Sequence, residues 1–370
     1  MENNLTQKGR ILKAVFPGKY LQGCGLLKEL PEMIKIFGKN GMILSSKTVN
    51  SNILSLPVNK VLTENLIIAE FNGECSNNEI QRIKKYIEDN NVDVLIGMGG
   101  GKVIDTAKIV ADKVNIPVII FPTIASTDAP CSGVAVIYSE EGIFESVYYL
   151  KLNPQIVAVD MDIIKFAPVR FLIAGIGDAL ATRFEAEACY RAKSKNECGG
   201  YGTLTALNLA RLCYTTILNY GELAIIANKK NIVTDALNHI VEANTLLSGI
   251  GFESAGLAAA HSIHNGLSAL KETHKFYHGE KVAFGTLAGL HLSDADPKLI
   301  DEVYTFCKKI GLPITLNEIG LGSVTKEDLY KVAVKTCVPE ESIYHEVGEI
   351  TPEKVFGALI AADETGRKYN

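Results

Sequence analysis

The side chains of this chain that are best suited to bind a metal ion lie in three separate segments. Asp178 follows the tripeptide Gly-Ile-Gly, His261 lies in an alanine-rich segment that also contains His264, and His278 precedes Gly279. One carboxylate and two imidazoles supply three ligands and leave a position open for water or a substrate hydroxyl, as a catalytic metal requires. Separate helices of a bundle often contribute such ligands. From spacing alone, hydrogen-bonded histidines in a helical core are the commoner alternative.

A glycine-rich turn, Gly97-Met98-Gly99-Gly100-Gly101-Lys102, has the composition of a phosphate-binding loop. It follows a predicted strand at 92–96 and opens a segment with helical apolar spacing. Glycines in such a turn let backbone N–H groups reach an anion, and such turns often require positive φ. The turn lacks the third glycine of the ordinary Rossmann fingerprint and the hydroxyl of a Walker A loop. An ATPase is therefore disfavoured, whereas a dinucleotide site or a tight turn without a ligand is compatible with the pattern.

Two neighbouring features are compatible with ligand binding and with purely structural roles. Asp105 lies near the start of the helix after the glycine-rich turn, where a carboxylate either contacts a ligand or caps free N–H groups. Loop 122–132 leaves the carboxyl end of a predicted strand, is rich in hydroxyls and contains Asp128 and Cys131. Ligands bind at that edge of open α/β sheets, so this loop could hold a cofactor and Asp128 a substrate hydroxyl. A loop bonded only to itself is an equal alternative, and Cys131 is interpreted as small apolar filler.

The elements that must position these residues divide the chain into two halves. Short apolar runs at 42–44, 66–69, 92–96 and 117–121 alternate with helical patterns, which predicts a parallel sheet with crossover helices. Helical patterns then follow one another at 178–192, 203–219, 234–248, 253–270, 298–310, 325–337 and 353–366. At 370 residues the chain is long enough for two domains. We predict an α/β domain over 1–164 and an all-α domain over 165–370, meeting in a cleft suited to a small molecule.

Composition argues against several classes of partner. The formal net charge is −5 and the basic residues are scattered, so we expect no nucleic-acid partner. No apolar run approaches the length of a membrane span and the N-terminus lacks the apolar region of a signal peptide, so we expect a cytoplasmic protein without a membrane partner. The eight cysteines include no C-x-x-C pair, which argues against a thiolate zinc site and against a redox dithiol.

Taken together, these segments resemble the glycerol dehydrogenase branch of the metal-dependent group III alcohol dehydrogenases over nearly the whole chain. The motifs that carry the resemblance are Gly-Gly-Gly-Lys with Asp105, Pro-Thr-Ile-Ala-Ser-Thr-Asp-Ala-Pro-Cys-Ser, Gly-Ile-Gly-Asp-Ala-Leu, the segment 249–266 with its two histidines, and His-Gly-Glu-Lys-Val-Ala-Phe-Gly. The resemblance implies a Rossmann-like parallel-sheet domain followed by a helical bundle domain, as in dehydroquinate synthase-like folds. It also implies zinc in the cleft and a homo-oligomer, often an octamer.

The resemblance assigns roles to individual residues. Asp178, His261 and His278 would bind the zinc ion, Asp128 would contact the substrate, and His264 would be a neighbour of the metal site but not a ligand. The implied reaction is the oxidation of glycerol or a related small polyol to dihydroxyacetone, with hydride transfer to NAD. The dinucleotide would lie along Gly99, Gly100, Gly101, Lys102, Asp105, Thr123, Ser126, Ser132, Val134 and Tyr138.

Two positions depart from the family pattern. The iron-dependent branch usually has a histidine four residues after the metal-binding aspartate, where this chain has Thr182. The three protein ligands that are left favour zinc over iron. Related enzymes usually place an aspartate against the adenosine ribose at the position of Ser46, so NADP is not excluded as the cofactor.

Several alternatives stay open at this point. A glycerol-1-phosphate dehydrogenase or a dehydroquinate synthase needs cations for its substrate's phosphate or carboxylate, and the motif loops offer few beyond Lys102 and Lys281. Another group III dehydrogenase would act on a different diol or a small aldehyde. From a different class, a non-catalytic binding or scaffold homologue would have no chemical need for the three intact ligand residues.

Overall fold

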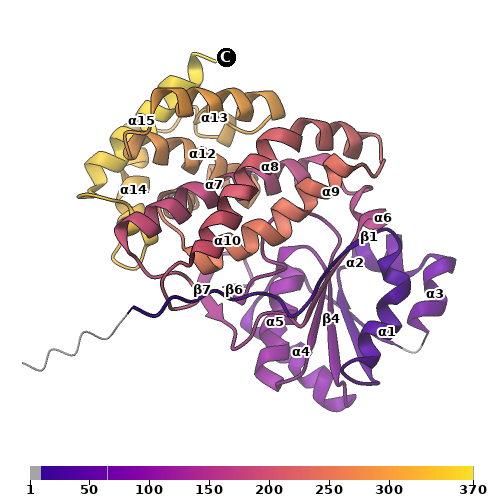
Figure 1. Cartoon of the computed structure of the whole chain (residues 1–370). Helices are drawn as coiled ribbons and strands as arrows, with labels where there is room; N and C mark the ends of the chain where they lie inside the picture. The colour runs from indigo at the N-terminus through magenta and orange to yellow at the C-terminus, as the bar shows by residue number, and fades with distance from the viewer. Residues whose placement is uncertain (1–9, 65, 370) are drawn as a thin grey trace, which may run out of the picture.

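The computed structural model describes residues 10–64 and 66–369, which form an α/β half followed by a helical half (Figure 1). Six parallel strands pair in the order β1-β8-β5-β4-β2-β3 and form the sheet of the first half. The predicted Rossmann-like parallel sheet is therefore confirmed. The strands are β1 Tyr20–Gly23, β2 Gly41–Ser45, β3 Ile67–Glu70, β4 Val94–Gly99, β5 Val118–Pro122 and β8 Ile156–Asp160.

Helices cover both faces of this sheet because its strands are apolar on both sides. Ile96 of β4 packs in a cluster with the helix that contains Met33, whereas its neighbour Leu95 packs in a second cluster with the helices that contain Ile80 and Ile104. The helices of this half are η1 Leu26–Glu29, α1 Leu30–Lys35, α2 Lys47–Val49, η2 Asn50–Leu54, α3 Pro57–Thr63, α4 Asn77–Asp89, α5 Gly101–Val114 and α6 Met161–Ile164.

Two sheet strands and a hairpin had no counterpart among the predicted strands. β8 lies inside the sheet, where Val157 pairs with Tyr20 of β1 on one side and with Ile120 of β5 on the other. The hairpin consists of β6 Val134–Tyr138 and β7 Phe144–Tyr149, which pair antiparallel outside the main sheet. In the sequence, the hairpin follows β5 and loop 123–133 and precedes β8.

From Met161 to Arg367 the named elements of the described chain are all helices, as predicted, with isolated β-bridges at Lys195 and Tyr201. α12 is a helix that the sequence patterns did not indicate, and α7 begins at Val169, well before residue 178. The expected helix 253–270 is broken at Gly256, whose φ of 110° ends α10. The elements are α7 Val169–Ala192, α8 Leu204–Lys229, α9 Asp235–Glu242, η3 Ala243–Leu247, α10 Ser248–Ala255, α11 Ala259–Leu267, η4 Lys271–Thr273, α12 His278–Leu292, α13 Pro297–Ile310, η5 Asn317–Ile319, α14 Lys326–Thr336, η6 Ser342–His345 and α15 Pro352–Arg367.

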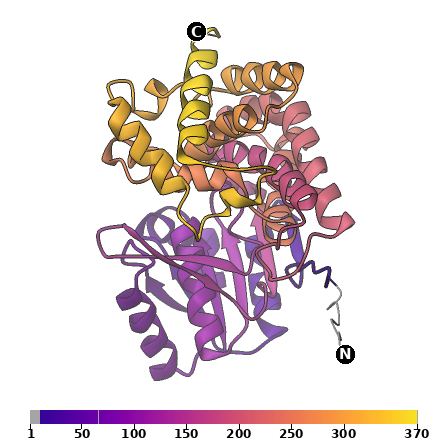
Figure 2. The ribbon, with the colours of Figure 1, turned by 90° about the vertical axis from the view of Figure 1, so that its left-hand side faces the viewer.

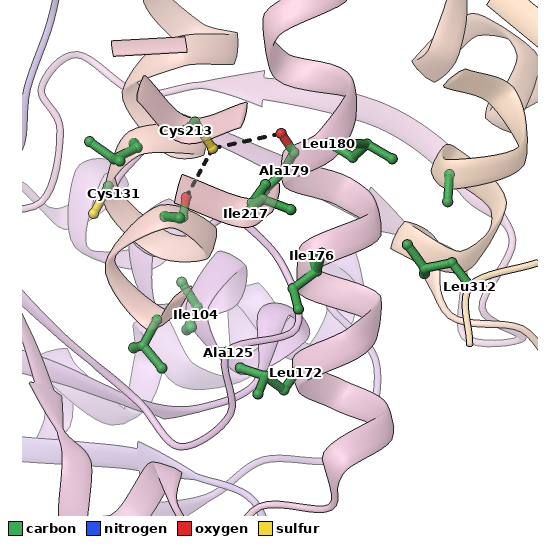
Figure 3. Close-up of a cluster of buried hydrophobic side chains, with 14 of the residues drawn as sticks. Ile104, Ala125, Cys131, Leu172, Ile176, Ala179, Leu180, Cys213, Ile217 and Leu312 are labelled. Atoms are coloured by element: carbon green, nitrogen blue, oxygen red, sulfur yellow. Dashed lines mark hydrogen bonds between the residues drawn. The ribbon is translucent and has the colours of Figure 1, made fainter. Parts of the chain in front are cut away.

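A shared core joins the two halves, which are stacked one on the other in Figure 2. Ile104 of α5, Leu172 of α7 and Ile217 of α8 belong to one buried cluster (Figure 3). The Cys213 thiol in this cluster donates to the carbonyls of Ala179 and Ala243. Packing across the junction therefore fixes how the helices lie against loop 123–133.

The remaining global predictions have different outcomes. All eight cysteines lie in the described chain and are free, and Cys131 is buried as expected for apolar filler. Among the described residues, no helix combines the length and the apolar composition that crossing a membrane requires. The sheet ends at Asp160 and α7 begins at Val169, but the division into separate domains at 164 and 165 stays a prediction.

Candidate metal centre

Three helices bring together the side chains that the sequence analysis proposed as metal ligands. Asp178 comes from α7, His261 from α11 and His278 from α12, and one potential ligand atom of each lies within 4.8 Å of the others. The Nε2 atom of His278 is 2.9 Å from Asp178 Oδ1, and that of His261 is 3.5 Å from the same oxygen. Residues that are far apart in the chain therefore form one compact cluster.

The Asp178 carboxylate in this cluster has no ordinary partner. Both of its oxygens are buried, and neither accepts a hydrogen bond from any described residue. Burial alone would raise the pKa of Asp178, but the facing His278 and His261 hold it below its usual value. An ionised buried carboxylate without hydrogen bonds requires a compensating cation.

The donor set of the cluster fits a divalent cation. A carboxylate oxygen is a hard ligand and imidazole nitrogens are borderline ligands, a combination that zinc and other divalent ions accept, and three protein ligands leave a coordination position for a substrate. The side chain of His278 is 40% exposed, so the cluster is open to solvent on that side. Asp178, His261 and His278 are therefore suited to hold a catalytic metal ion.

Glu185, which the sequence analysis did not single out, orients His261. Its Oε2 atom is 2.6 Å from His261 Nδ1, and its Oε1 atom accepts the backbone N–H groups of Ala258 and His261. A carboxylate on Nδ1 leaves Nε2 of the same ring to face Asp178. Burial lowers the pKa of His261, but Glu185 and then Asp178 raise it well above its usual value. The sequence signal was the spacing of Asp178 and Glu185, which puts both on one face of α7.

His264 contacts His278 and faces away from Asp178. Its Nε2 atom is 3.1 Å from His278 Nδ1, and its own Nδ1 is 3.0 Å from Asn265 Oδ1. Burial, reinforced by the charge of His278, lowers the pKa of His264 well below its usual value. A neutral His264 ring between Asn265 and His278 is suited to orient the His278 ring, in agreement with its expected place beside the cluster.

Close packing of two helices sets the distance between Asp178 and His278. A Cβ atom on Gly279, at the start of α12, would lie 1.8 Å from the backbone oxygen of Ala174 on α7. A Cβ on Gly177 would lie 2.4 Å from the backbone oxygen of Gly279. The two helices meet backbone to backbone here because both positions lack a side chain.

Loop 123–133 places Asp128 at the same junction. Asn244 of η3 donates its side-chain amide to the carbonyl of Ala125 at 3.0 Å, which holds the loop against the helical half. The hydroxyl of Ser248 donates to Asp128 Oδ2 at 2.8 Å. Burial, reinforced by the charge of Asp178, raises the pKa of Asp128 to about 8.

The glycine-rich turn joins β4 to α5 and leaves the start of that helix open. Gly100 occupies the N-cap position, and no described side chain caps the helix. None of the glycines at 97 and 99–101 has a positive φ, so the expectation that the turn requires one is wrong. Space explains three of these glycines. A Cβ on Gly97 would lie 2.6 Å from Ala107 Cβ, one on Gly99 2.9 Å from Val103 Cβ, and one on Gly100 2.9 Å from the side chain of Ile124.

The residues expected along the dinucleotide differ in how far the protein already uses them. Lys102 is exposed and pairs with Glu74 at 2.5 Å, and its Nζ lies 5.5 Å from the centre of the Tyr138 ring. The backbone N–H of Thr123 donates to the carbonyl of Gly99 at 3.0 Å, so loop 123–133 starts beside the glycine-rich turn. Ser126 and Val134 are both half-buried.

Asp105 and Ser132, also expected at the dinucleotide, bind other parts of the protein. Asp105 does not cap α5: its Oδ2 atom accepts the backbone N–H of Val136 at 3.0 Å, and its Oδ1 is 3.2 Å from Lys108 Nζ. The Ser132 hydroxyl lies 3.4 Å from the same Nζ. The side chains of Asp105 and Ser132 therefore bind Lys108 and the backbone of β6, and so stabilise loop 123–133 and β6 within the protein.

Lys108 is a buried cation that the sequence analysis overlooked. Its side chain is 0% exposed, and its Nζ donates to the carbonyls of Ala129 at 2.8 Å, Ser132 at 3.2 Å and Val134. These bonds, together with the ion pair to Asp105, tie loop 123–133 and β6 to α5. The helical spacing of Asp105 and Lys108 was the available signal.

The two departures from the family pattern have structural roles. Thr182 lies one helical turn after Asp178 on α7, and its Oγ1 is 2.8 Å from the hydroxyl of Ser248. The Ser46 hydroxyl accepts the backbone N–H of Val49 at 3.3 Å and so caps α2.

The chain is similar to alcohol dehydrogenases along its whole length. The family model described as iron-containing alcohol dehydrogenase matches residues 17–161. A glycerol dehydrogenase of Thermotoga maritima is 51% identical over 96% of this chain and 98% of its own length. A glycolaldehyde reductase of Halobacterium salinarum is 43% identical over 95% of this chain and 97% of its own length.

Solved structures extend this similarity to the fold. The crystal structure of glycerol dehydrogenase from Schizosaccharomyces pombe matches with a TM-score of 0.92 at 38% identity, covering 98% of this chain and 92% of that chain. Identity at this level across both halves is a family relationship as well as a shared fold. The chain therefore belongs to the glycerol dehydrogenase branch of the iron-containing, or group III, alcohol dehydrogenases.

Proposed function

We propose that this protein is a zinc-dependent dehydrogenase that oxidises glycerol to dihydroxyacetone and transfers the hydride to NAD. The observation that carries the proposal is the Asp178 carboxylate. Its buried oxygens accept no hydrogen bond from the described residues, and its Oδ1 faces two imidazoles, one of them partly open to solvent. The relatives from Thermotoga maritima and Schizosaccharomyces pombe, both named glycerol dehydrogenases, support glycerol as the substrate.

The three ligands favour zinc over iron. Asp178, His261 and His278 would hold the ion, with Glu185 and His264 orienting the two rings, and Thr182 adds no imidazole. When bound, the divalent cation would supply Lewis-acid chemistry at a substrate hydroxyl, and the dinucleotide would supply the hydride acceptor.

Asp128 supplies the remaining polar contact to the substrate. Its carboxylate is held by Ser248 at the junction and acts as acceptor for a polyol hydroxyl. Oxidation removes a hydride from carbon and a proton from oxygen. Asp128, whose pKa is raised to about 8, is suited to take that proton once its carboxylate forms as the pH rises towards this value.

The dinucleotide would bind where the glycine-rich turn meets α5. The uncapped start of α5 supports a pyrophosphate at Gly99, Gly100, Gly101 and Lys102. Thr123, Ser126, Val134 and Tyr138 would line the cofactor, while Asp105 and Ser132 support it from behind. Because Ser46 provides no carboxylate for the adenosine ribose, use of NADP is not excluded.

A second candidate reaction, the reduction of a small hydroxyaldehyde, is supported by the glycolaldehyde reductase of Halobacterium salinarum. It would use the same residues in the reverse direction. Phosphorylated substrates are less well supported, because Lys102 pairs with Glu74 and the buried Lys281 donates to Ser268.

Metal removal and replacement test the proposal. The protein is treated with a chelator, supplied with zinc, iron(II) or manganese(II), and assayed with NAD or NADP and glycerol, propane-1,2-diol, glycerol phosphate or, in reverse, glycolaldehyde. We expect turnover of glycerol to be lost on chelation and restored best by zinc, and not restored in D178N. Turnover that survives chelation would remove the metal mechanism. Failure of every substrate would favour the non-catalytic homologue.

A further inference from the structure

Three buried oxygen-bearing side chains form a chain of hydrogen bonds from loop 123–133 into the helical half. Ser248, the first residue of α10, donates its hydroxyl to Asp128 Oδ2 at 2.8 Å. Thr182 Oγ1 on α7 lies 2.8 Å from Ser248 Oγ. Asp128 is 7% exposed, Ser248 0% and Thr182 1%. Within the described chain, Ser248 is the only side chain that hydrogen-bonds to the Asp128 carboxylate.

The chemistry of these groups gives the chain a direction. In its ionised form, the form that takes the substrate proton, the Asp128 carboxyl accepts hydrogen bonds only, so the single hydroxyl hydrogen of Ser248 is used on Asp128. Ser248 can then only accept from Thr182, and the Thr182 hydroxyl must be the donor. In the order Thr182 to Ser248 to Asp128, the Thr182 hydroxyl donates and the Ser248 hydroxyl both accepts and donates, so the position of Thr182 determines where the Ser248 hydroxyl points.

Close backbone packing holds Ser248, the middle residue of this chain of hydrogen bonds, in place. A Cβ on Gly251 of α10 would lie 2.3 Å from the methyl group of Thr182, so α10 rests directly on that side chain. A Cβ on Gly249 would lie 3.0 Å from the backbone oxygen of Asp128. Ser248 is therefore held between α7 and loop 123–133, where its hydroxyl is positioned to hydrogen-bond with Thr182 and Asp128.

We propose that Ser248 and Thr182 are positioning residues of the dehydrogenase, which hold one oxygen of Asp128 so that the other is presented to a substrate hydroxyl. The inference rests on the proposed function. Thr182 lies one turn after Asp178, so a single rigid helix carries both a metal ligand and the far end of this chain. This chain of hydrogen bonds thus sets the position of Asp128 relative to the Asp178 cluster through α7.

A matched pair of substitutions at Thr182 tests the proposal. T182V keeps the branched shape and removes the hydroxyl, whereas T182S keeps the hydroxyl and removes the methyl group that contacts Gly251. We expect T182V to lower kcat/KM for glycerol about five- to tenfold, the effect of one buried hydrogen bond, with KM for NAD and bound zinc unchanged. T182S is expected to recover most of this loss. A purely packing role predicts the reverse ranking, with T182S the more impaired variant, and would overturn the proposal.

A double-mutant cycle shows whether Thr182 acts through Asp128. D128N is expected to lower turnover by itself. Adding T182V to it is expected to cause no further fall in kcat/KM, because the hydrogen-bond chain no longer ends on a carboxylate. Falls that add independently would overturn the proposal. S248A, which should match T182V, gives a second route if T182V folds poorly. If the wild-type protein fails to oxidise any polyol, the proposed function itself fails; if it turns over and T182V matches it, only the positioning role fails.

Discussion

At the scale of single residues, the candidate centre is a set of buried charges in which each group depends on the next. Asp178 faces His261, and His261 is held from behind by Glu185. A carboxylate behind a metal-binding imidazole raises its basicity and fixes its orientation. Glu185 also accepts the backbone N–H of Ala258, the N-cap residue of α11. The same side chain therefore orients the ring and the start of the helix that carries it.

The first prediction concerns Glu185. E185Q keeps the size of the side chain and removes its charge, so we expect the zinc affinity to fall about 10- to 100-fold. Competition with a coloured chelator measures this change. E187Q on the same helix is the control, because Glu187 pairs with Arg183 and Arg211 away from the cluster. Equal zinc affinities of E185Q and the wild type would contradict the assigned role.

The second prediction concerns the pH dependence given by Asp128. Burial and then the charge of Asp178 raise the pKa of Asp128 to about 8, so its carboxylate forms only as the pH rises towards that value. A cation bound at Asp178 weakens the second cause, which places the transition at or below about 8. We expect kcat/KM for glycerol to rise with pH up to this point and then level off. D128N should lack this rise, and a rise retained in D128N would assign it to another group.

At the scale of elements, α7 is the helix around which the candidate site is built. It carries Asp178, Thr182 and Glu185 at spacings that place all three on one face. Gly177 on the same helix allows α12 to approach closely enough for His278 to reach Asp178. A single rigid helix therefore sets the relative positions of the proposed metal ligand Asp178, the carboxylate of Glu185 and the hydroxyl of Thr182.

The third prediction concerns the connection of loop 123–133 to α5 through Lys108. K108M leaves Asp105 buried without its partner, so we expect a loss of about 3 to 5 kcal/mol in the free energy of unfolding. The midpoint of chemical denaturation measures it. K113M, a change at an exposed position of the same helix, should have little effect. The double variant D105N/K108M should recover part of the loss, and a stable K108M protein would show that the ion pair does not hold the loop.

At the scale of the whole molecule, the candidate site belongs to neither half alone. Loop 123–133 and the glycine-rich turn come from the α/β half, while α7, α11 and α12 come from the helical half. One buried cluster includes residues of both halves, so the halves keep a defined relative position. Cytoplasmic location and the division into two domains stay predictions.

The fourth prediction concerns assembly. The resemblance to the glycerol dehydrogenase branch implies a homo-oligomer, and α8 exposes apolar side chains at Leu212, Leu223 and Ile226. Contiguous exposed apolar surface is typical of protein contacts. Light scattering is expected to give a mass several times the 40.1 kDa of one chain, with an octamer as the proposed state. A mass of one chain at assay concentrations would contradict this prediction.

Whether the sequence predicted a helix or a strand depended on how polar residues are distributed along that element. The helical pattern expected between the apolar runs at 66–69 and 92–96 corresponds to α4, which buries Ile80, Ile83 and Ile87 and has an exposed, polar opposite face. α12 was missed because residues 279–288 are all buried, which removes the polar face that marks a helical period. β8 was missed although, like the predicted β2 and β5, it is a fully buried, largely apolar run of five residues.

The sequence by itself determined the kinds of ligand that the chain offers, the glycine-rich turn and the order of an α/β half and a helical half. These properties depend on side-chain type and short-range spacing. Only the tertiary structure decided that Asp178, His261 and His278 converge, that Glu185 lies behind His261, and that Asp105 faces Lys108. The reason is physical: contacts between distant segments depend on how closely whole helices approach, and at Gly177 and Gly279 the absence of one Cβ atom sets that distance.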